Sequence, residues 1–460
     1  MANYLDFMGE SMKKILKPAL KYSILMLNFI LCIFFLTNCV SKAENASSSV
    51  SEDEKEESVS SIGELIKQKK LKDISPISLR FVYDLDMDKE EGLEGLIRVF
   101  NAGNDYGIEV ELVRAAAIDW TAYNGEDNEI RLPDMVLTDA SGIKGSISLL
   151  TELDSYFEEF EIDKNDFYES LISQVSDNNS VYGVPLLSVN SVVYYNKALL
   201  EENAAEGFSS IDELLETAEI VKEKEDIALI GTADVSDLFE SFYIEAANEL
   251  AKDISFIKNN EFKPDRDVTK KALEKLFSAC ENGYINVYSD YESMHSDYKN
   301  KNIAGYVSDS SDGYYEELES VETSAYMTPV SGKGIKTLYS GYLGVTAKDE
   351  NTRKACMELI SYLIGSHELA LFDIATAYQP VKEGSSGESE YKTYAEYAKA
   401  AGAYLSFAAK VKGHELYVSK LYENKEIKEK LSDILYMELR NESKYEEALE
   451  SILIGFEQAE

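Results

Sequence analysis

The chain has few of the residues on which metal sites and nucleophilic catalysis depend. Its 460 residues include 4 cysteines, 3 histidines and 1 tryptophan. The histidines, His295, His367 and His414, are scattered and lie near no cluster of acids and nucleophiles. No Cys/His spacing indicates a metal site, and the chain has no Gly-x-Ser-x-Gly elbow, Gly-rich phosphate loop or His-Glu-x-x-His motif. We therefore predict no metal, no cofactor and no enzymatic activity.

Basic residues are also scarce. The chain has 45 Lys and Arg against 85 Asp and Glu, a formal net charge of -40. No basic stripe is present to neutralise phosphates, so the composition argues against a nucleic-acid partner. It argues equally against a cationic face that binds membranes. We interpret the acidic excess as ordinary solvated surface.

The N-terminus is typical of an exported protein. Four lysines between residues 13 and 21 precede an uncharged run, residues 23–37, that is too short to span a bilayer comfortably. Met12 lies just before the lysines and is an alternative start of translation to Met1. We assign residues 1–38 to a signal peptide, and Cys32 is removed with it.

The end of this run, Leu36-Thr37-Asn38-Cys39, resembles a bacterial lipobox, although that motif usually has Gly, Ala or Ser where this chain has Asn38. The resemblance implies that Cys39 becomes the lipidated first residue, anchored by more than one acyl chain. The alternative is an uncleaved anchor with Cys39 as an incidental thiol. Residues 41–61 are nearly devoid of apolar side chains, so we assign residues 39–74 to the lipidated cysteine, a flexible tether and its lead-in.

From residue 75 onward, apolar residues alternate between strand and helix patterns. The predicted strands are 79–83, 108–112, 133–137, 227–231 and 302–306, and the predicted helices are 93–100, 211–224, 237–251, 269–280 and 351–365. From Tyr391 the chain reads as nearly all helix. Strands separated by helices favour an α/β fold with a largely parallel sheet. About 400 residues are too many for one compact core and suit two lobes. Cys280 and Cys356 fall in helical patterns and are predicted to be buried thiols.

Several segments, in order, resemble those of extracellular solute-binding proteins of the maltose-binding type. Residues 181–185, Val-Tyr-Gly-Val-Pro, and 193–197, Val-Tyr-Tyr-Asn-Lys, are similar to the segment that crosses between the two lobes in that family. Further similar segments are Pro133-Asp134-Met135-Val136, Leu149 to Leu153, Tyr326 to Gly334 with one of the two usual prolines, Gly341 to Lys348, and Gln379-Pro380-Val381. The resemblance covers about residues 75 to 460.

The resemblance implies a two-lobed periplasmic-binding-protein fold of type II, with a ligand cleft between lobes joined by hinge crossings. It places residues 75–188 plus 331–380 in the N-terminal lobe and residues 189–330 plus 381–460 in the C-terminal lobe. The implied function is that of the substrate-binding lipoprotein of an ABC importer, which binds a carbohydrate and hands it to permease subunits. Such a protein is expected to be a monomer, anchored through Cys39 to the outer face of the cytoplasmic membrane, or to the outer membrane of a diderm.

In an open parallel sheet, ligands meet the loops at the carboxyl ends of the strands. Short polar side chains for sugar hydroxyls and aromatic rings for the C–H face of a sugar are the types expected there. Since the chain has 31 Tyr and 1 Trp, we expect a tyrosine platform. The candidates are Tyr83, Asp84, Asp139, Ser141, Ser188, Asn190, Asp234, Asp309, Ser310, Gly341 and Tyr342, with Trp120 added from a helix of the first lobe.

These assignments leave alternatives open. Each Asp also fits a plain helix cap, and Trp120 also fits a helix anchor. We expect Tyr342→Ala to weaken ligand binding while leaving the fold intact. Other functions for the chain are a sensory or adhesion lipoprotein of the same fold, and a secreted glycosidase, which needs two positioned carboxylates. A peptide, a polyamine or an anion is the alternative ligand; a sugar is favoured because the segments around Tyr182 and Gly341 resemble the sugar-binding branch.

Overall fold

The computed structural model describes residues 77–85, 87, 89–115, 118, 132–202, 208, 210–258, 261–312, 323–328, 334–382, 389–391, 393, 415–441 and 443–457. The signal peptide, Cys39, the tether and Trp120 lie outside these residues, so their roles stay predictions. Within the described residues, no helix combines the length and the apolar character that crossing a membrane requires.

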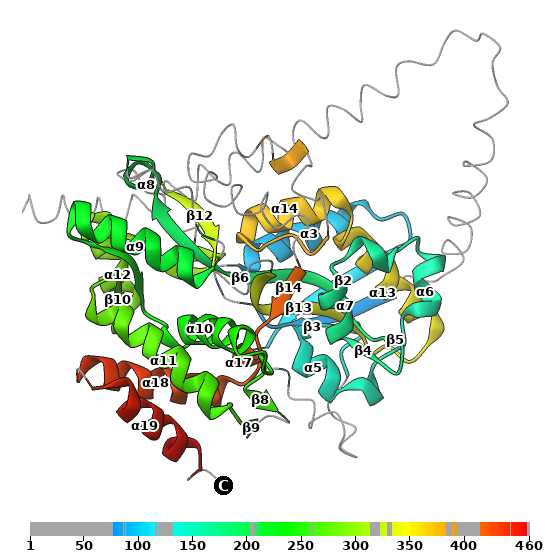
Figure 1. The fold of residues 1–460 in the computed structure, drawn as a ribbon. Coiled ribbons are helices and arrows are strands. Elements are labelled where there is room, and N and C mark those ends of the chain that lie inside the picture. The colour runs from blue at the N-terminus through cyan, green and yellow to red at the C-terminus, as the bar shows by residue number, and fades with distance from the viewer. Residues whose placement is uncertain are drawn as a thin grey trace, which may run out of the picture. The chain divides into compact units, whose positions relative to one another are not determined.

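Most of the strands form one large mixed sheet (Figure 1). Its order is β10-β7-β11-β6-β13-β3-β1-β2, with β12 paired to β6 and β14 paired to β13. These strands are β1 Ile77–Tyr83, β2 Ile108–Arg114, β3 Met135–Asp139, β6 Val184–Asn196, β7 Ala228–Thr232, β10 Ile285–Val287, β11 Ile303–Asp309, β12 Thr323–Met327, β13 Gly334–Val345 and β14 Glu415–Val418. Short hairpins pair β4 Ser176–Asp177 with β5 Ser180–Val181, and β8 Ile257–Lys258 with β9 Glu261–Phe262.

Two parallel sets of strands are joined by antiparallel ones. Strand β1 runs parallel to β2 and β3, and β7 runs parallel to β10 and β11. Strands β6 and β13 are antiparallel to each other. Strand β6 is also antiparallel to β11, and β13 is also antiparallel to β3. The sheet is therefore mixed, and the predicted parallel pairing holds within each set. We call β13, β3, β1 and β2 the first half-sheet, and β10, β7 and β11 the second half-sheet.

Strand β6 belongs to both halves. Its 13 residues are all buried, as its run of Val, Leu and Tyr predicts. The first part pairs with β13, where Ser188 lies opposite Ser340. The second part pairs with β11 on one side and β12 on the other, so that Tyr194 lies opposite both Tyr306 and Ala325. One strand thus carries the chain from the first half-sheet into the second.

Helices cover both faces of the sheet. They are α3 Glu90–Gly103, α5 Ala140–Gly145, α6 Asp154–Glu159, α7 Glu169–Gln174, α8 Lys197–Glu202, α9 Ile211–Glu225, α10 Val235–Glu249, α11 Arg266–Glu281, α12 Tyr291–Lys299, α13 Glu350–Leu363, α14 Ser366–Thr376, α17 Lys420–Glu423, α18 Lys425–Arg440 and α19 Tyr445–Glu457, with single 3₁₀ turns at Ile147–Leu149 and Lys164–Asp166. The predicted helices are confirmed to within a few residues, except that α3 is longer than predicted at both ends. Side chains of Ser210, Asp265, Asp290 and Asp349 cap the first turns of α9, α11, α12 and α13.

The prediction of nearly continuous helix after Tyr391 is wrong at β14. Residues Glu415–Val418 pair in parallel with Gly334–Thr337 of β13. A four-residue segment has too little local pattern to overcome the surrounding helical signal, and its strand character comes from this long-range pairing.

Two hydrophobic cores lie on opposite faces of the second half-sheet. One contains β1, β3, α3 and α13 and continues under α12, where Met294 and Tyr298 are buried. The other contains α9, α10, α11, α18 and α19. Because side chains alternate along a strand, Tyr194 of β6 lies in the first core and Tyr195 in the second.

Helix α10 is enclosed on all sides. Every residue from Val235 to Ala247 is buried, although the segment includes Asp237, Glu240 and Glu245. A helix with no exposed face normally carries apolar residues all round. The carboxylates of α10 therefore need partners inside the protein.

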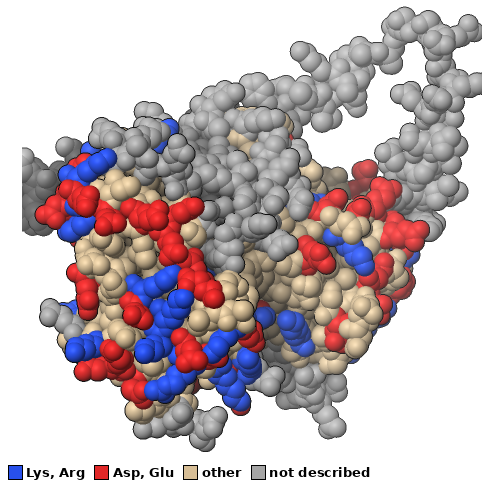
Figure 2. All heavy atoms as spheres, in the orientation of Figure 1, with Lys and Arg blue, Asp and Glu red and all other residues tan. Residues whose placement is uncertain are grey.

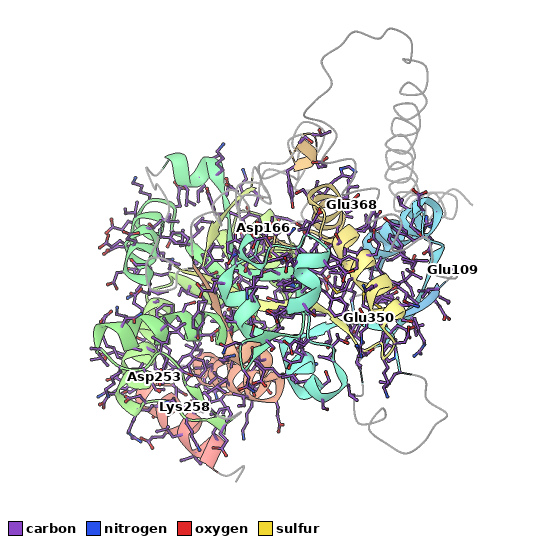
Figure 3. All side chains as sticks on the ribbon, turned by 90° about the vertical axis from the view of Figure 1, so that its right-hand side faces the viewer. Glu109, Asp166, Asp253, Lys258, Glu350 and Glu368 are labelled. Atoms are coloured by element: carbon purple, nitrogen blue, oxygen red, sulfur yellow. The ribbon has the colours of Figure 1, made fainter. Side chains whose placement is uncertain are left out.

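The outer surface carries the acidic excess. Figure 2 shows Asp and Glu side chains on both sides of the visible face, with Lys and Arg among them and most densely at the lower left of the view. Asp253 and Lys258, labelled in Figure 3, form one such pair, with 3.0 Å between Oδ2 and Nζ. Exposed pairs of this kind contribute about 0 to 1 kcal/mol each, so they keep the surface solvated more than they hold the fold.

Candidate functional site

The carboxyl ends of β1 and β3 present two exposed aspartates. Asp84 follows β1, and its backbone N–H donates to the Leu137 carbonyl at 3.4 Å. Asp139 ends β3, and its Oδ1 accepts hydrogen bonds from Gly142 N at 2.7 Å and from Ser141 Oγ at 2.8 Å. Asp139 is thus a helix cap for α5 whose carboxylate and Ser141 partner still lie at the surface. Asp139 can therefore act as a helix cap and still present its carboxylate to a ligand.

Tyr83 is a core residue rather than a surface ring. It is buried at the end of β1 and meets Phe81 edge-on, with 6.4 Å between ring centroids. Burial and the nearby Glu90 carboxylate raise the pKa of its phenol. Its ring is therefore not available to stack on a ligand in this arrangement.

At the end of β7, Asp234 is enclosed. Its Oδ2 lies 2.6 Å from Lys428 Nζ and accepts a hydrogen bond from Tyr422 OH at 2.9 Å, while Oδ1 accepts one from Ser236 Oγ at 2.5 Å. Burial alone would raise the pKa of this carboxyl, but the Lys428 ammonium and these donors lower it below its ordinary value. Asp234 ties the start of α10 to α17 and α18.

At the end of β11, Asp309 accepts two hydrogen bonds from Ser311, from N at 2.8 Å and from Oγ at 2.5 Å. Burial raises the pKa of the Asp309 carboxyl, and the neighbouring Asp312 carboxylate adds to that effect. Lys89, the buried residue just before α3, acts in the opposite direction.

Tyr291 lies in the same region and was not among the predicted residues. It begins α12 just after the end of β10, and 45% of its surface is exposed. Partial burial and the carboxylates of Asp234 and Asp309 raise the pKa of its phenol. His295, one turn later, contacts Asp312 with 2.9 Å between Nε2 and Oδ2. In the sequence, the feature that could have identified Tyr291 as a site residue is its position as an aromatic residue shortly after a strand.

The structure brings Ser188, Asn190 and Ser310 together at the middle of β6. Asn190 N donates to Ser310 Oγ at 3.0 Å, and Ser310 N donates to the Asn190 carbonyl at 2.8 Å. The Asn190 side-chain oxygen accepts from Thr337 Oγ1 at 2.9 Å and from Ser188 Oγ at 3.4 Å. All three candidate residues are buried, so their polar groups bind one another across the junction of the half-sheets.

Gly341 and Tyr342 lie on β13, next to this cluster. A Cβ on Gly341 would stand 2.8 Å from Leu187 Cγ, so only glycine allows β6 and β13 to approach this closely. Tyr342 is 0% exposed, and within the described residues its hydroxyl has no hydrogen-bond partner of ordinary geometry. The same is true of Ser340 Oγ and of both amide atoms of Gln379, the residue that bridges to Ser188.

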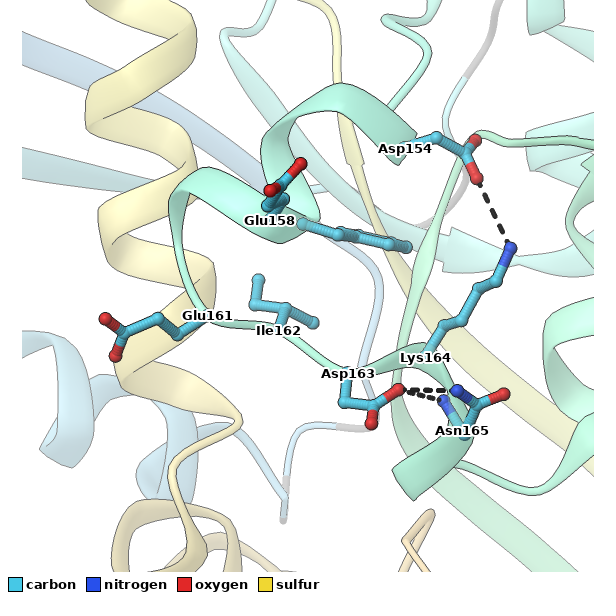
Figure 4. A pocket seen from close by; sticks show the side chains of 8 residues that line it. Asp154, Glu158, Glu161, Ile162, Asp163, Lys164 and Asn165 are labelled. Atoms are coloured by element: carbon cyan, nitrogen blue, oxygen red, sulfur yellow. Dashed lines mark hydrogen bonds and ion pairs between the residues drawn. The ribbon is translucent and has the colours of Figure 1, made fainter.

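Two surface concavities lie away from all these residues. One, of about 450 Å³, surrounds the loop after α6, where Lys164 reaches Asp154 at 3.6 Å and Asp163 accepts from Asn165 (Figure 4). The other, of about 370 Å³, lies along β10 between Cys280 and Arg440. Neither contains a candidate residue, and neither has convergent buried polar groups of the kind that fix a ligand.

A group of three acids, Asp212, Glu245 and Glu249, is spaced closely enough to hold a metal ion. Lys275 already satisfies it, with Nζ at 2.9 Å from Asp212, 2.6 Å from Glu249 and 3.6 Å from Glu245. We therefore interpret this group as an ion-pair cluster.

A family model described as bacterial extracellular solute-binding protein matches residues 95–399 of the chain. No curated protein sequence is detectably similar. Among solved structures, the cyclic α-maltosyl-1,6-maltose binding protein of Arthrobacter globiformis superposes with a TM-score of 0.63 at 13% identity, over 83% of this chain and 98% of that one.

Two further structures superpose over similar lengths. The sugar-binding protein MalE of Xanthomonas citri has a TM-score of 0.62 at 16% identity, over 83% of this chain and 97% of that one. UgpB of Mycobacterium tuberculosis, solved with glycerophosphocholine, has a TM-score of 0.60 at 18% identity, over 84% and 98%. These likenesses establish the fold, which is that of the two-lobed periplasmic binding proteins.

Proposed function

Because the chain belongs to the bacterial extracellular solute-binding proteins, a family of binding proteins and not of enzymes, we propose that it is the substrate-binding lipoprotein of an ABC importer. It binds its ligand reversibly where the two half-sheets face each other and delivers it to permease subunits. The observations that carry this proposal are the match to the family and strand β6, which joins two half-sheets whose strands end near Asp84, Asp139 and Asp309. Loops of the two halves that face each other at strand ends form the kind of site that a two-lobed binding protein closes upon.

The proposed ligand is a carbohydrate. Asp84, Asp139 and Ser141 offer exposed oxygen atoms after β1 and β3, and Tyr291 offers a partly exposed ring after β10. Carboxylates and hydroxyls accept and donate hydrogen bonds to sugar hydroxyls, and a tyrosine ring packs on the apolar face of a sugar. Two of the similar structures are named for the sugars that they bind.

A ligand that contains a phosphodiester is the second candidate, since UgpB was solved with glycerophosphocholine. The carboxylates of Asp84, Asp139, Asp309 and Asp312 would oppose a negative charge, whereas they accept hydrogen bonds from neutral hydroxyls. The carbohydrate is therefore favoured, and the experiment below distinguishes the two.

The anchor and the lobe boundaries are part of the proposal. Lipid on Cys39 would hold the monomeric protein outside the cytoplasmic membrane, with residues 41–61 as tether. The proposed lobes are residues 75–188 plus 331–380 and residues 189–330 plus 381–460. The passage of β6 from one half-sheet to the other near residue 190 supports the first of these boundaries.

The test is a thermal-shift screen on the chain from residue 62 onward, followed by titration calorimetry of each hit. The panel holds mono- and oligosaccharides, with amino acids, peptides, polyamines, phosphate esters and glycerophosphodiesters as comparison classes. A ligand at a hundredfold excess over its dissociation constant adds about 2.7 kcal/mol of stability. A sugar hit supports the proposal, a hit only among the other classes replaces the ligand, and no hit in any class favours a sensory or adhesion role.

A matched pair of variants then locates the site. Tyr291→Ala should weaken binding of the sugar hit, because it removes the exposed ring beside Asp309. Met437→Ala, which alters an equally exposed apolar side chain on α18, should leave the affinity unchanged. Equal affinities for the two variants would remove Tyr291 from the site.

A further inference from the structure

Two carboxylates of the buried helix α10 lie one turn apart on one face. Asp237 is 2% exposed and Glu240 is 0% exposed. Residues three positions apart on a helix are neighbours. Burying two like charges together is unfavourable unless cations and hydrogen bonds compensate them. The partners of these two groups therefore reveal what the pair does.

The partners come from four separate segments near the junction of the half-sheets. Lys336 of β13 lies 2.5 Å from Asp237 Oδ1, Ser191 of β6 donates to Asp237 Oδ2 at 2.5 Å, and Ser419, just after β14, donates to Glu240 Oε2 at 2.7 Å. The Ser191 hydroxyl has one proton and gives it to Asp237, so Thr328, just after β12, donates its own to Ser191 at 2.7 Å. Strands β6 and β13 and the segment after β14 are thus tied to α10 directly, and the segment after β12 is tied to it through Ser191.

Among the described residues, the cation beside both acids is Lys336, and it pairs more closely with Asp237 than with Glu240. Lys336 Nζ donates to the Asp237 carbonyl at 2.5 Å and to Ser241 Oγ at 2.8 Å, and it pairs with Asp237 Oδ1. Two of the three ammonium protons are used in these hydrogen bonds, whereas the contact with Asp237 Oδ1 is an ion pair without hydrogen-bond geometry. Glu240 Oε2 is 4.0 Å from Nζ and receives none. Burial accordingly raises the pKa of Glu240 to about 7, although Lys336 opposes the shift.

No second cation among the described residues compensates Glu240. Strand β14 contributes the Tyr417 hydroxyl, 3.4 Å from Oε1, and α17 contributes Tyr422, which is bound to Asp234. The lysine of α18 that faces this end of α10, Lys428, is paired with Asp234. The lysines that α11 turns toward α10, Lys271 and Lys275, are paired with Glu245 and Glu249 near its far end, and α9 adds Asp212 there.

We propose that Asp237, Glu240 and Lys336 form a proton-dependent anchor for the crossing strands. With a proton on Glu240, one cation balances one carboxylate, and β13 and β14 are held against α10. Release of that proton to solvent leaves two carboxylates around one ammonium in a dry site, which weakens the hold. The equilibrium between more open and more closed arrangements of the half-sheets then shifts with pH. This behaviour belongs to the unliganded protein, so it does not depend on the ligand proposed above.

The test measures the distance between the half-sheets without ligand. In the mature chain with Cys39→Ser, spin labels at Val99→Cys on α3 and Ile220→Cys on α9 report this distance, because both positions are exposed and lie on opposite halves. The native thiols, Cys280 and Cys356, have pKa values raised by burial and react slowly. Distance distributions are recorded between pH 5 and pH 9.

The expected result is a shift of the distribution as pH rises from 5 to about 7, complete above that, which Glu240→Gln abolishes. Glu245→Gln is the matched control and should keep the shift, because Glu245 is a buried acid of the same helix whose partners in the described part of the chain are Ile211 of α9 and Lys275 of α11. A distribution that does not change with pH, or a shift that survives in Glu240→Gln, overturns the proposal.

Amide hydrogen exchange supplies a second readout that needs no labels. In the wild-type chain, opening of Gly334–Thr337 should become more frequent as pH rises through the same range, by up to about tenfold per pH unit after correction for intrinsic rates, the limit for one linked proton. The Glu240→Gln variant should lack this dependence, and its presence there would contradict the anchor.

Discussion

The two half-sheets end in the same kind of residue but use it differently. Asp139, at the end of β3, is exposed, and within the described residues its carboxylate accepts hydrogen bonds from Ser141 and Gly142 of α5, the helix that it caps. Asp234, after β7, is enclosed by Lys428 and Tyr422, which arrive from nearly 200 residues later in the chain. The second half-sheet has to hold these C-terminal helices, whereas the first does not. A strand-end aspartate is therefore free to meet a ligand only where no distant segment already needs it.

The largest expected effect tests β13, the strand of the first half-sheet that pairs with β6. Tyr342→Ala should lower the free energy of unfolding by about 3–5 kcal/mol, because it removes a fully buried ring and leaves a cavity. The expectation from the sequence that Tyr342→Ala leaves the fold intact is tested by the same measurement of unfolding free energy. Tyr342→Phe should lie within about 1 kcal/mol of the wild type, since its hydroxyl has no partner of ordinary geometry. Urea denaturation measures both, and a Phe variant as unstable as the Ala variant would show that the hydroxyl is bound.

The next effect contrasts the two strand ends directly. Asp234→Ala should cost about 2–4 kcal/mol, because Lys428 would be left partly buried without its partner. Asp234→Ala/Lys428→Met should recover part of that loss, since neither charge then remains. The same urea experiment measures each variant. If Asp234→Ala costs no more than a surface substitution, then α17 and α18 do not depend on this residue.

The elements that formed as predicted are those with a strong local signal. The strands at 79–83 and 108–112 and the helix between them follow from apolar period and from turn residues that adjoin them. Strand β14 could not be predicted, because its strand character depends on β13, some 80 residues earlier. Local pattern specifies what a segment can form, but long-range pairing decides between the options.

The same limit applies to the candidate site. Residues at strand ends were found from their position, but burial of Tyr83 and Tyr342 depends on helices packed over them from elsewhere in the chain. Asp237 and Glu240 look like an exposed helix face until Lys336, 99 residues after Asp237, is placed beside them. A buried ion pair between segments far apart leaves no local trace in composition or spacing.

A pH series sharpens the comparison further. The pKa of Glu240 is about 7 in the folded protein, above its ordinary value of 4.5, so the folded state binds the proton more tightly. Stability from this group is present below about pH 4.5 and is lost as pH rises through 7, with a slope of up to about 1.4 kcal/mol per pH unit. Glu240→Gln should flatten the fall in unfolding free energy over this range. Parallel pH curves for the variant and the wild type would place the proton elsewhere.

The smallest expected change in stability concerns Asp139, the exposed aspartate at the end of β3. Asp139→Ala removes a helix cap and should cost about 1 kcal/mol. If its carboxylate also binds the ligand, the affinity for a sugar should fall by about tenfold or more, the value of one hydrogen bond to a charged group. Asp163→Ala is the matched control, because Asp163 accepts a similar local bond from Asn165 but lies in the loop after α6. Calorimetric titration of both separates the roles. Equal affinities would make Asp139 a cap alone, whereas a loss confined to Asp139→Ala would show that the first half-sheet keeps its strand-end carboxylate for the ligand.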